Sequence, residues 1–198
     1  MREIVVISGK GGTGKTSVAA SLAVLADRPV VADCDVDAAD LHLVLRPSIV
    51  ERHEFRSGNQ AVIRREDCTG CGACLAHCRF DAVRTDGPAA GPGGFFVEPL
   101  ACEGCGVCVW NCPAEAIDFP ERVCGSWMIS DTRCGPMVHA RLGVAAENSG
   151  KLVSTVRREA RRIAEERDRF LMIVDGPHGI GCPVIASLTG ASLALVVT

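Results

Sequence analysis

The stretch that decides the fold of this chain is Gly9-Lys10-Gly11-Gly12-Thr13-Gly14-Lys15-Thr16, or GKGGTGKT. It fits the phosphate-loop pattern, in which a glycine and four further residues precede Gly-Lys-Ser/Thr. A β-branched run at 4–7 precedes it, which is typical of a buried parallel strand. An apolar segment rich in helix formers follows at 18–26, so we expect a helix to begin near Lys15 or Thr16. Strand, loop and helix in this order predict a phosphate site.

The chemistry of that site follows from the residue types. Small residues let the backbone surround a phosphate chain, and N–H groups at the start of the helix point inward with the positive end of its dipole. Lys15 would neutralise charge on the β- and γ-phosphates, and the Thr16 hydroxyl would hold Mg²⁺. We therefore expect ATP and Mg²⁺ to bind at 9–16.

Two other interpretations of the glycines compete. Gly9-x-Gly11-x-x-Gly14 is also the dinucleotide fingerprint, with Asp33 or Asp35 as the ribose-binding carboxylate. A dinucleotide loop has no use for Lys-Thr after its last glycine, and a purely structural turn explains neither lysine. The phosphate loop is favoured.

A second lysine, Lys10, distinguishes this loop from an ordinary one. It resembles the deviant Walker A motif, KGGxGKT, of the MinD-type ATPases, which include the nitrogenase iron protein, the arsenite-pump ATPase and ATPases of iron–sulfur assembly. The resemblance implies an α/β fold with a parallel sheet in three α/β/α layers. It also implies an ATP-dependent homodimer in which Lys10 reaches the partner's nucleotide.

Composition limits the class of protein. The chain has 198 residues, which suffice for one α/β domain and a small second one, and 47% are apolar. A net charge of -3 predicts no nucleic-acid partner. The N-terminus runs straight into a strand without a signal peptide, and no 18-residue apolar span follows, so we expect a cytoplasmic protein without a membrane span. In that compartment 12 cysteines indicate metal binding rather than disulfides.

Acidic residues follow the predicted strand at 30–32, within Asp33-Cys34-Asp35-Val36-Asp37. The carboxyl end of a strand beside a phosphate loop lies in the ligand crevice of an α/β sheet. In the MinD-type family this segment is switch I. The resemblance implies that Asp35 orients the attacking water, with Asp37 as the second candidate, whereas the simpler alternative is a solvated acidic turn.

A second acidic position ends the buried strand predicted at 170–175. This is a Walker B placement, in which Asp175 would hold Mg²⁺ through water. Gly176-Pro177-His178-Gly179 follows and is similar to the switch II motif D-x-P-P-G, with His178 in place of the second proline. The resemblance implies that the N–H of Gly179 reaches the γ-phosphate. We interpret His178 as a tolerated substitution, with a contact to phosphate or a partner as the alternative.

Two runs of cysteines occupy the middle of the chain and repeat with their neighbouring glycines. They are similar to the bacterial two-cluster ferredoxins over about 64–119, and in that family the fourth cysteine of each run binds the other cluster. The resemblance implies one 4Fe–4S cluster on Cys68, Cys71, Cys74 and Cys112, and a second on Cys102, Cys105, Cys108 and Cys78. Pro113 follows the second run as the pattern requires, but Arg79 follows the first, which puts the surroundings of one cluster in doubt.

The predicted organisation is therefore an ATPase domain at 1–63 and 120–198, interrupted by a ferredoxin-like α+β insert at 64–119 with a flexible linker at 85–94. A zinc ribbon would need pairs of C-x-x-C separated by a spacer rather than two runs of four. The insert is too small to fold without metal. Cys34, Cys124, Cys134 and Cys182 remain; we interpret them as small buried residues, with a dimer-bridging site at Cys124 and Cys134 as the alternative.

The last third of the chain predicts further α/β elements. Val153, Val156, Ala160 and Ile163 repeat at helical spacing after a cap at Asn148 or Ser149. The arginines of this helix indicate a solvated face, with a docking patch as the alternative. A turn at 181–183 leads into another helix, and a last buried strand is expected at 193–197. The chain stops at Thr198, where the family usually continues.

Together these patterns predict an ATPase that gates electron transfer through two 4Fe–4S clusters to an unidentified redox protein. The alternatives are an iron–sulfur assembly or carrier protein that uses ATP to deliver a cluster to a client, and a regulatory ATPase that senses redox state. Eight cysteine ligands in ferredoxin-type runs favour permanent clusters, and hence electron transfer.

Overall fold

The structure is a computed structural model that describes residues 1–85, 94–143 and 149–198. The chain divides into two compact units. The first, here called the sheet unit, comprises Met1–Phe55 and Cys124–Thr198. The second, the cysteine unit, comprises Arg56–Val123. Most of the linker expected at 85–94 lies outside the described residues.

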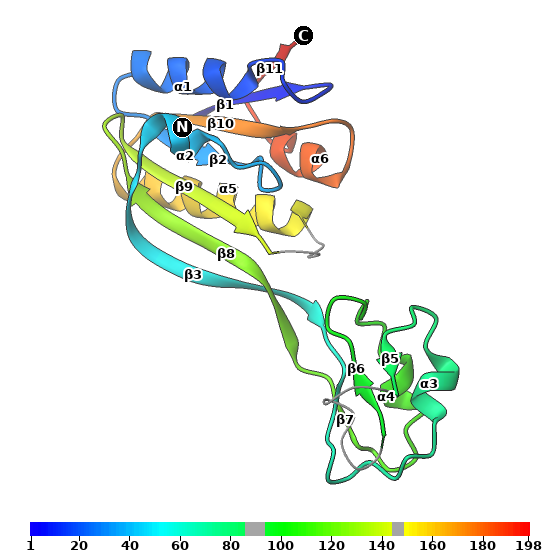
Figure 1. The fold of residues 1–198 in the computed structure, drawn as a ribbon. Coiled ribbons are helices and arrows are strands. Elements are labelled where there is room, and N and C mark those ends of the chain that lie inside the picture. The colour runs from blue at the N-terminus through cyan, green and yellow to red at the C-terminus, as the bar shows by residue number, and fades with distance from the viewer. Residues whose placement is uncertain (86–93, 144–148) are drawn as a thin grey trace. The chain divides into compact units, whose positions relative to one another are not determined.

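One mostly parallel sheet forms the centre of the sheet unit, with strand order β11-β1-β10-β2-β9-β8-β3 (Figure 1). Neighbours from β11 to β9 pair in parallel, and β8 pairs antiparallel with β9. The strands are β1 (Arg2–Ser8), β2 (Val30–Asp33), β3 (Ser48–Asn59), β8 (Glu121–Asp131), β9 (Pro136–Leu142), β10 (Leu171–His178) and β11 (Leu193–Val197). The predicted class, α/β with a mostly parallel central sheet, is confirmed.

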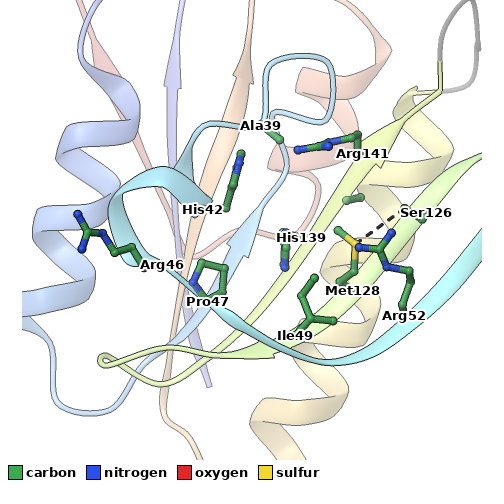
Figure 2. Close-up of a pocket in the computed structure, with 11 residues that line it drawn as sticks. Ala39, His42, Arg46, Pro47, Ile49, Arg52, Ser126, Met128, His139 and Arg141 are labelled. Atoms are coloured by element: carbon green, nitrogen blue, oxygen red, sulfur yellow. Dashed lines mark hydrogen bonds between the residues drawn. The ribbon is translucent and has the colours of Figure 1, made fainter.

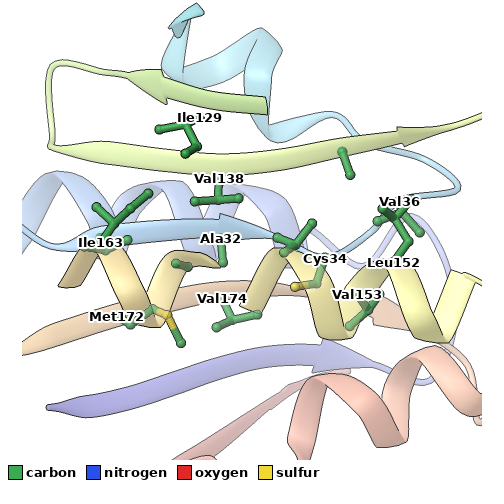
Figure 3. Packing of buried hydrophobic residues seen from close by; sticks show 14 of the residues in the cluster. Ala32, Cys34, Val36, Ile129, Val138, Leu152, Val153, Ile163, Met172 and Val174 are labelled. Carbon is green, nitrogen blue, oxygen red and sulfur yellow. The ribbon is translucent and has the colours of Figure 1, made fainter. Parts of the chain in front are cut away.

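Side-chain alternation along the strands builds a hydrophobic core on each face of the sheet. Val5 and Val30 pack on the face covered by α5 (Ser149–Glu166), and Figure 3 shows strand residues such as Ala32 and Val174 with Leu152 and Val153 of that helix. Their neighbours in sequence, including Val6 and Val31, pack on the opposite face. There they meet α1 (Lys15–Leu25) and α2 (Leu41–Leu45).

Several expected elements are confirmed. Helix α1 begins at Lys15. The apolar stripe of α5, which includes Val153, Val156 and Ile163, is buried. Helix α6 (Cys182–Leu188) follows its predicted turn. Of the two cap candidates for α5, Ser149 is already helical and Asn148 lies outside the described residues.

One prediction about strands was wrong. The strand expected to be buried at 193–197 is β11, which lies at the edge of the sheet beside β1 alone, so Leu193 and Val196 are 56% and 57% exposed. The buried strand expected at 170–175 is confirmed as β10, which begins at Leu171 and continues past Asp175 to His178. In addition, β3, β8 and β9 were not predicted.

The cysteine unit contains short elements around a small core of its own. Antiparallel pairs join β4 (Val62–Ile63) to β7 (Ile117–Asp118) and β5 (Val83–Arg84) to β6 (Phe96–Val97). Two single-turn helices accompany them, α3 (Ala73–His77) and α4 (Val107–Trp110). The core includes Ala61, Ala82 and Ile117 with the cysteines Cys74 and Cys102. In the part of the chain that the structure describes, no helix is both long and apolar enough to cross a bilayer.

Candidate functional site

The loop at 9–16 connects β1 to α1 at the carboxyl end of the sheet. Gly14 precedes the helix with a φ of 86°, in the left-handed region that favours glycine, and no side chain caps the first turn. The N–H groups of that turn therefore face a pocket of about 340 Å³, which we call the nucleotide pocket. It is lined by Ser8, Gly11, Gly12, Thr13, Gly14, Lys15, Thr16, Ser17, Asp35, Ala38, Asp40 and His178. Free N–H groups at a helix start are suited to bind phosphate.

Lys15 joins three elements of the site. Its Nζ lies 2.9 Å from Oδ2 of Asp35 and 3.0 Å from Oδ1 of Asp175. Burial alone would lower the pKa of Lys15, but the charge and hydrogen bonds of these two carboxylates raise it above its ordinary value. The ammonium group is therefore positively charged and held between the ends of two strands.

The carboxylates meet there because of strand register. Asp33 and Asp175 are paired positions on the adjacent parallel strands β2 and β10. Burial and the charge of Asp175 raise the pKa of Asp33 well above its ordinary value. Burial also raises the pKa of Asp175, although the charge of Lys15 and a hydrogen bond with Thr16 act against it. The sequence placed Asp33 in the ligand crevice at the end of the strand at 30–32 but gave it no role in the phosphate site; the pairing of β2 with β10 brings it beside Asp175.

The site fits a magnesium ion. Asp33 Oδ2, Asp35 Oδ1 and Asp175 Oδ2 are buried and lack a hydrogen-bond partner among the described residues. Thr16 lies beside Asp175, as their hydrogen bond requires. Carboxylate and hydroxyl oxygens are the ligands that Mg²⁺ prefers. Thr16 and Asp175, predicted as its ligands, are thus close together.

Other predicted residues differ in their placement. Gly9 and Lys10 are exposed and do not line the pocket, and Asp37 is also exposed.

The N–H of Gly179 donates to the carbonyl oxygen of Ser8 at 3.0 Å, so it would have to leave that partner to reach a phosphate. His178 does line the pocket, with Nδ1 3.7 Å from Asp35 Oδ2.

Four of the eight cysteines of the cysteine unit share a cavity. Cys68, Cys71 and Cys74 line it together with Cys112, which comes from the other run. Burial, followed by the charges of Cys102, Cys105 and Cys78, raises the pKa of the Cys108 thiol to about 11. Those three cysteines therefore lie near Cys108.

The two cysteine runs, which repeat in sequence, also make the same hydrogen bond to their fourth cysteine. The N–H of Ala82 donates to Sγ of Cys78 at 3.4 Å, and the N–H of Ala116 donates to Sγ of Cys112 at 3.3 Å. Within the described ranges, however, no group of three or more His, Cys, Asp or Glu side chains is arranged to hold a metal ion.

The remaining cysteines are not alike. Cys34 and Cys124 are buried, as expected, whereas Cys134 is half-buried and Cys182 is exposed. Trp110, which lies between Cys108 and Cys112, is 78% exposed, so its ring is largely in solvent.

Comparison with known proteins adds three matches. The family model of the CobQ/CobB/MinD/ParA nucleotide binding domain matches residues 4–176. An uncharacterized protein of Methanocaldococcus jannaschii is 36% identical over 205 residues, which cover 98% of this chain and 66% of that protein. The crystal structure of the cell division ATPase MinD of Pyrococcus furiosus matches with a TM-score of 0.45 and 19% identity, covering 100% of this chain and 59% of that one. The chain thus spans less than two thirds of the length of each of these proteins.

Proposed function

Since the chain belongs to the CobQ/CobB/MinD/ParA family of nucleotide-binding domains, we propose that it is an ATPase whose nucleotide state controls electron transfer through two 4Fe–4S clusters. ATP would bind in the nucleotide pocket, with the N–H groups of 11–16 around its phosphates. The active form would be a homodimer, in which the exposed Lys10 of one subunit approaches the nucleotide of the other.

Lys15 gives the site two states. Without nucleotide its ammonium group is bound to Asp35 and Asp175. Phosphate oxygens would draw it away, which leaves Asp35 free to accept a hydrogen bond from the attacking water. Thr16 directly, and Asp175 through water, would hold Mg²⁺, which when bound neutralises charge on the β- and γ-phosphates.

The observation that carries the iron–sulfur part is the cavity that Cys112 shares with Cys68, Cys71 and Cys74. In two-cluster ferredoxins the fourth cysteine of each run binds the other cluster. A cavity lined by three cysteines of the first run and the fourth cysteine of the second run supports this arrangement. The clusters, when bound, supply one-electron redox centres.

The chain itself offers a route between the two halves. Asp35 begins a segment that continues through α2 into β3, and the boundary between the units falls within β3, after Phe55. At the end of β3, Asn59 Nδ2 donates to the carbonyl oxygen of Phe119 at 2.7 Å. Movement of Asp35 would therefore be transmitted along the chain through α2 into β3, which continues into the cysteine unit. The electron acceptor would be a client redox protein.

Anaerobic purification with iron and sulfide analysis tests this proposal. We expect about eight irons per chain, as two cubes require, and reversible bleaching of the visible absorption on reduction. Both clusters should remain in the protein when ATP is hydrolysed. Zinc, or no metal, on the cysteine runs would contradict the proposal, and transfer of iron to an apo-acceptor on addition of ATP would favour a cluster carrier instead.

A further inference from the structure

A second pocket lies in the sheet unit between α2 and the strands β3, β8 and β9 (Figure 2). We call it the arginine pocket. Its volume is about 290 Å³, close to the lower limit of about 300 Å³ for small-molecule sites. The walls include Arg46, Arg52, Arg141, His42 and His139. It is separate from the phosphate loop and has no part in the proposed ATPase chemistry.

The pocket collects positive charge from different elements. His42 lies on α2 and Arg46 at its C-terminal end, Arg52 is on β3, and Arg141 is on β9. No acidic residue is among those described as lining it. Burial, and then the charges of His42, Arg141 and Arg52, lower the pKa of His139 to about 4. The positive potential inside the pocket is therefore not neutralised by the protein.

Surface arginines are common, and the simpler interpretation is a solvated face. The arginines of α5 show how this chain treats such a face. Arg161 binds Glu3, Arg158 binds Glu159, and Arg162 binds Glu159 and Glu166, whereas the buried Arg157 also binds Glu3. Arg46, Arg52 and Arg141 have no carboxylate partner in the described part of the chain. Three unpaired guanidinium groups around one concavity are typical of an anion site.

The rest of the lining indicates the size and kind of anion. Ile49, Pro47, Met128 and Ala140 supply apolar surface beside the arginines. A bare inorganic ion would gain nothing from that surface, and a folded macromolecule could not enter such a volume. We propose that the arginine pocket binds a small organic anion that carries at least two carboxylate or phosphoryl groups on a short carbon skeleton.

One short segment separates this pocket from the nucleotide pocket. Ala38 and Asp40 line the nucleotide pocket, whereas Ala39 and His42 line the arginine pocket. An anion that draws His42 inward therefore moves a wall of the nucleotide pocket, and its binding should change nucleotide affinity. By thermodynamic linkage, nucleotide must change anion affinity by the same factor. This coupling rests on the proposed nucleotide site, but binding of the anion does not.

Isothermal titration of the anaerobically purified 198-residue chain tests the assignment. The probes are propane-1,2,3-tricarboxylate and glycerol 3-phosphate, with acetate as a monovalent control, first without nucleotide. The pocket variant is Arg52→Gln/Arg141→Gln, and the charge-matched control is Arg158→Gln/Arg162→Gln on α5. All four arginines are exposed, so both variants should fold, as circular dichroism can verify.

We expect at least one divalent or trivalent probe to bind, with affinity at least about tenfold lower in the pocket variant and unchanged in the control. Whichever probe binds identifies the carboxylate or the phosphoryl class. Binding by neither probe, an equal loss of affinity in both variants, or binding of acetate as tightly as the two probes would overturn the assignment. A second titration with ADP then tests coupling: unchanged anion affinity at saturating ADP would overturn coupling, whereas absence of ADP binding would overturn the nucleotide site and leave the anion result intact.

Discussion

The ammonium group of Lys15 lies 2.9 Å from the carboxylate of Asp35, and both side chains are almost fully buried. The first residue belongs to the phosphate loop, and the second follows β2. This ion pair links the group that should bind phosphate to the group that should position water. Nucleotide cannot engage Lys15 fully without breaking it, so the pair is the first contact expected to change when ATP binds.

Lys15→Ala should raise the dissociation constant of ATP by at least about 100-fold, or about 2.7 kcal/mol. The reason is that Lys15 lines the nucleotide pocket and supplies its charge. Lys10→Ala is the matched control. Because the Lys10 side chain is exposed outside the pocket, this variant should keep ATP affinity while losing hydrolysis in the dimer. Fluorescent-nucleotide titration measures both, and normal affinity in Lys15→Ala would refute the site.

Asp35→Asn should reduce the ATP hydrolysis rate by about 10²- to 10⁴-fold, the usual contribution of a group that activates the nucleophile. ATP binding should persist, because the backbone and Lys15 remain. Asp37→Asn changes the same charge on an exposed residue outside the pocket and should leave the rate within about twofold. Equal losses in the two variants, measured by steady-state phosphate release, would mean that Asp35 has no special role.

Cys112→Ala should remove the cluster assigned to Cys68, Cys71 and Cys74, although Cys112 belongs to the other cysteine run. The shared cavity is the reason. Iron analysis should show a loss of about four irons per chain, and paramagnetic resonance of the reduced protein should lose the same signal as in Cys74→Ala. The exposed Cys182 provides a control, since Cys182→Ala should retain all iron. If Cys112→Ala instead loses the signal that is lost in Cys105→Ala, then Cys112 binds the cluster of its own run and the ligand assignment is wrong.

His139 should make folding stability depend on pH. It is 6% exposed, it shares a hydrogen bond of 2.8 Å with Ser130, and its pKa is lowered from 6.5 to about 4. Between those values the unfolded chain takes up a proton that the folded chain does not, so stability falls as pH decreases from about 6.5 towards 4. The loss from pH 7.5 to 5 should be about 2 kcal/mol greater in wild type than in His139→Gln. Urea denaturation at both pH values measures this difference, and equal losses would show that His139 is not responsible.

Local patterns predicted the centre of the sheet unit well. The run before Gly9 and the apolar residues after Lys15 have one interpretation each, because a buried strand and a buried helix are strongly constrained. Strand register then explains why Asp33 and Asp175 lie side by side, next to the contacts of Lys15 with Asp175 and Asp35.

The strands β3, β8 and β9 could not be predicted from the sequence, and the reason is physical. Residues of β3 near Ile49 and Arg52 are exposed on both faces, so no alternation of apolar and polar residues marks the strand. The arginine pocket could not be predicted either, since it depends on the pairing of β8 with β9 and on the position of α2. The apolar sequence of β11 predicts a buried strand, but the strand order places it at an exposed edge of the sheet, and strand order cannot be read from local sequence.

The most direct test of coupling between nucleotide and clusters is the midpoint potential of the clusters, titrated anaerobically with and without saturating Mg-ATP. If ATP affinity differs at least fivefold between the oxidised and reduced proteins, the potential must shift by about 40 mV or more. The proposed function predicts such a shift in wild type and its absence in Lys15→Ala. Identical potentials with and without ATP, in a protein that binds ATP and contains both clusters, would contradict it.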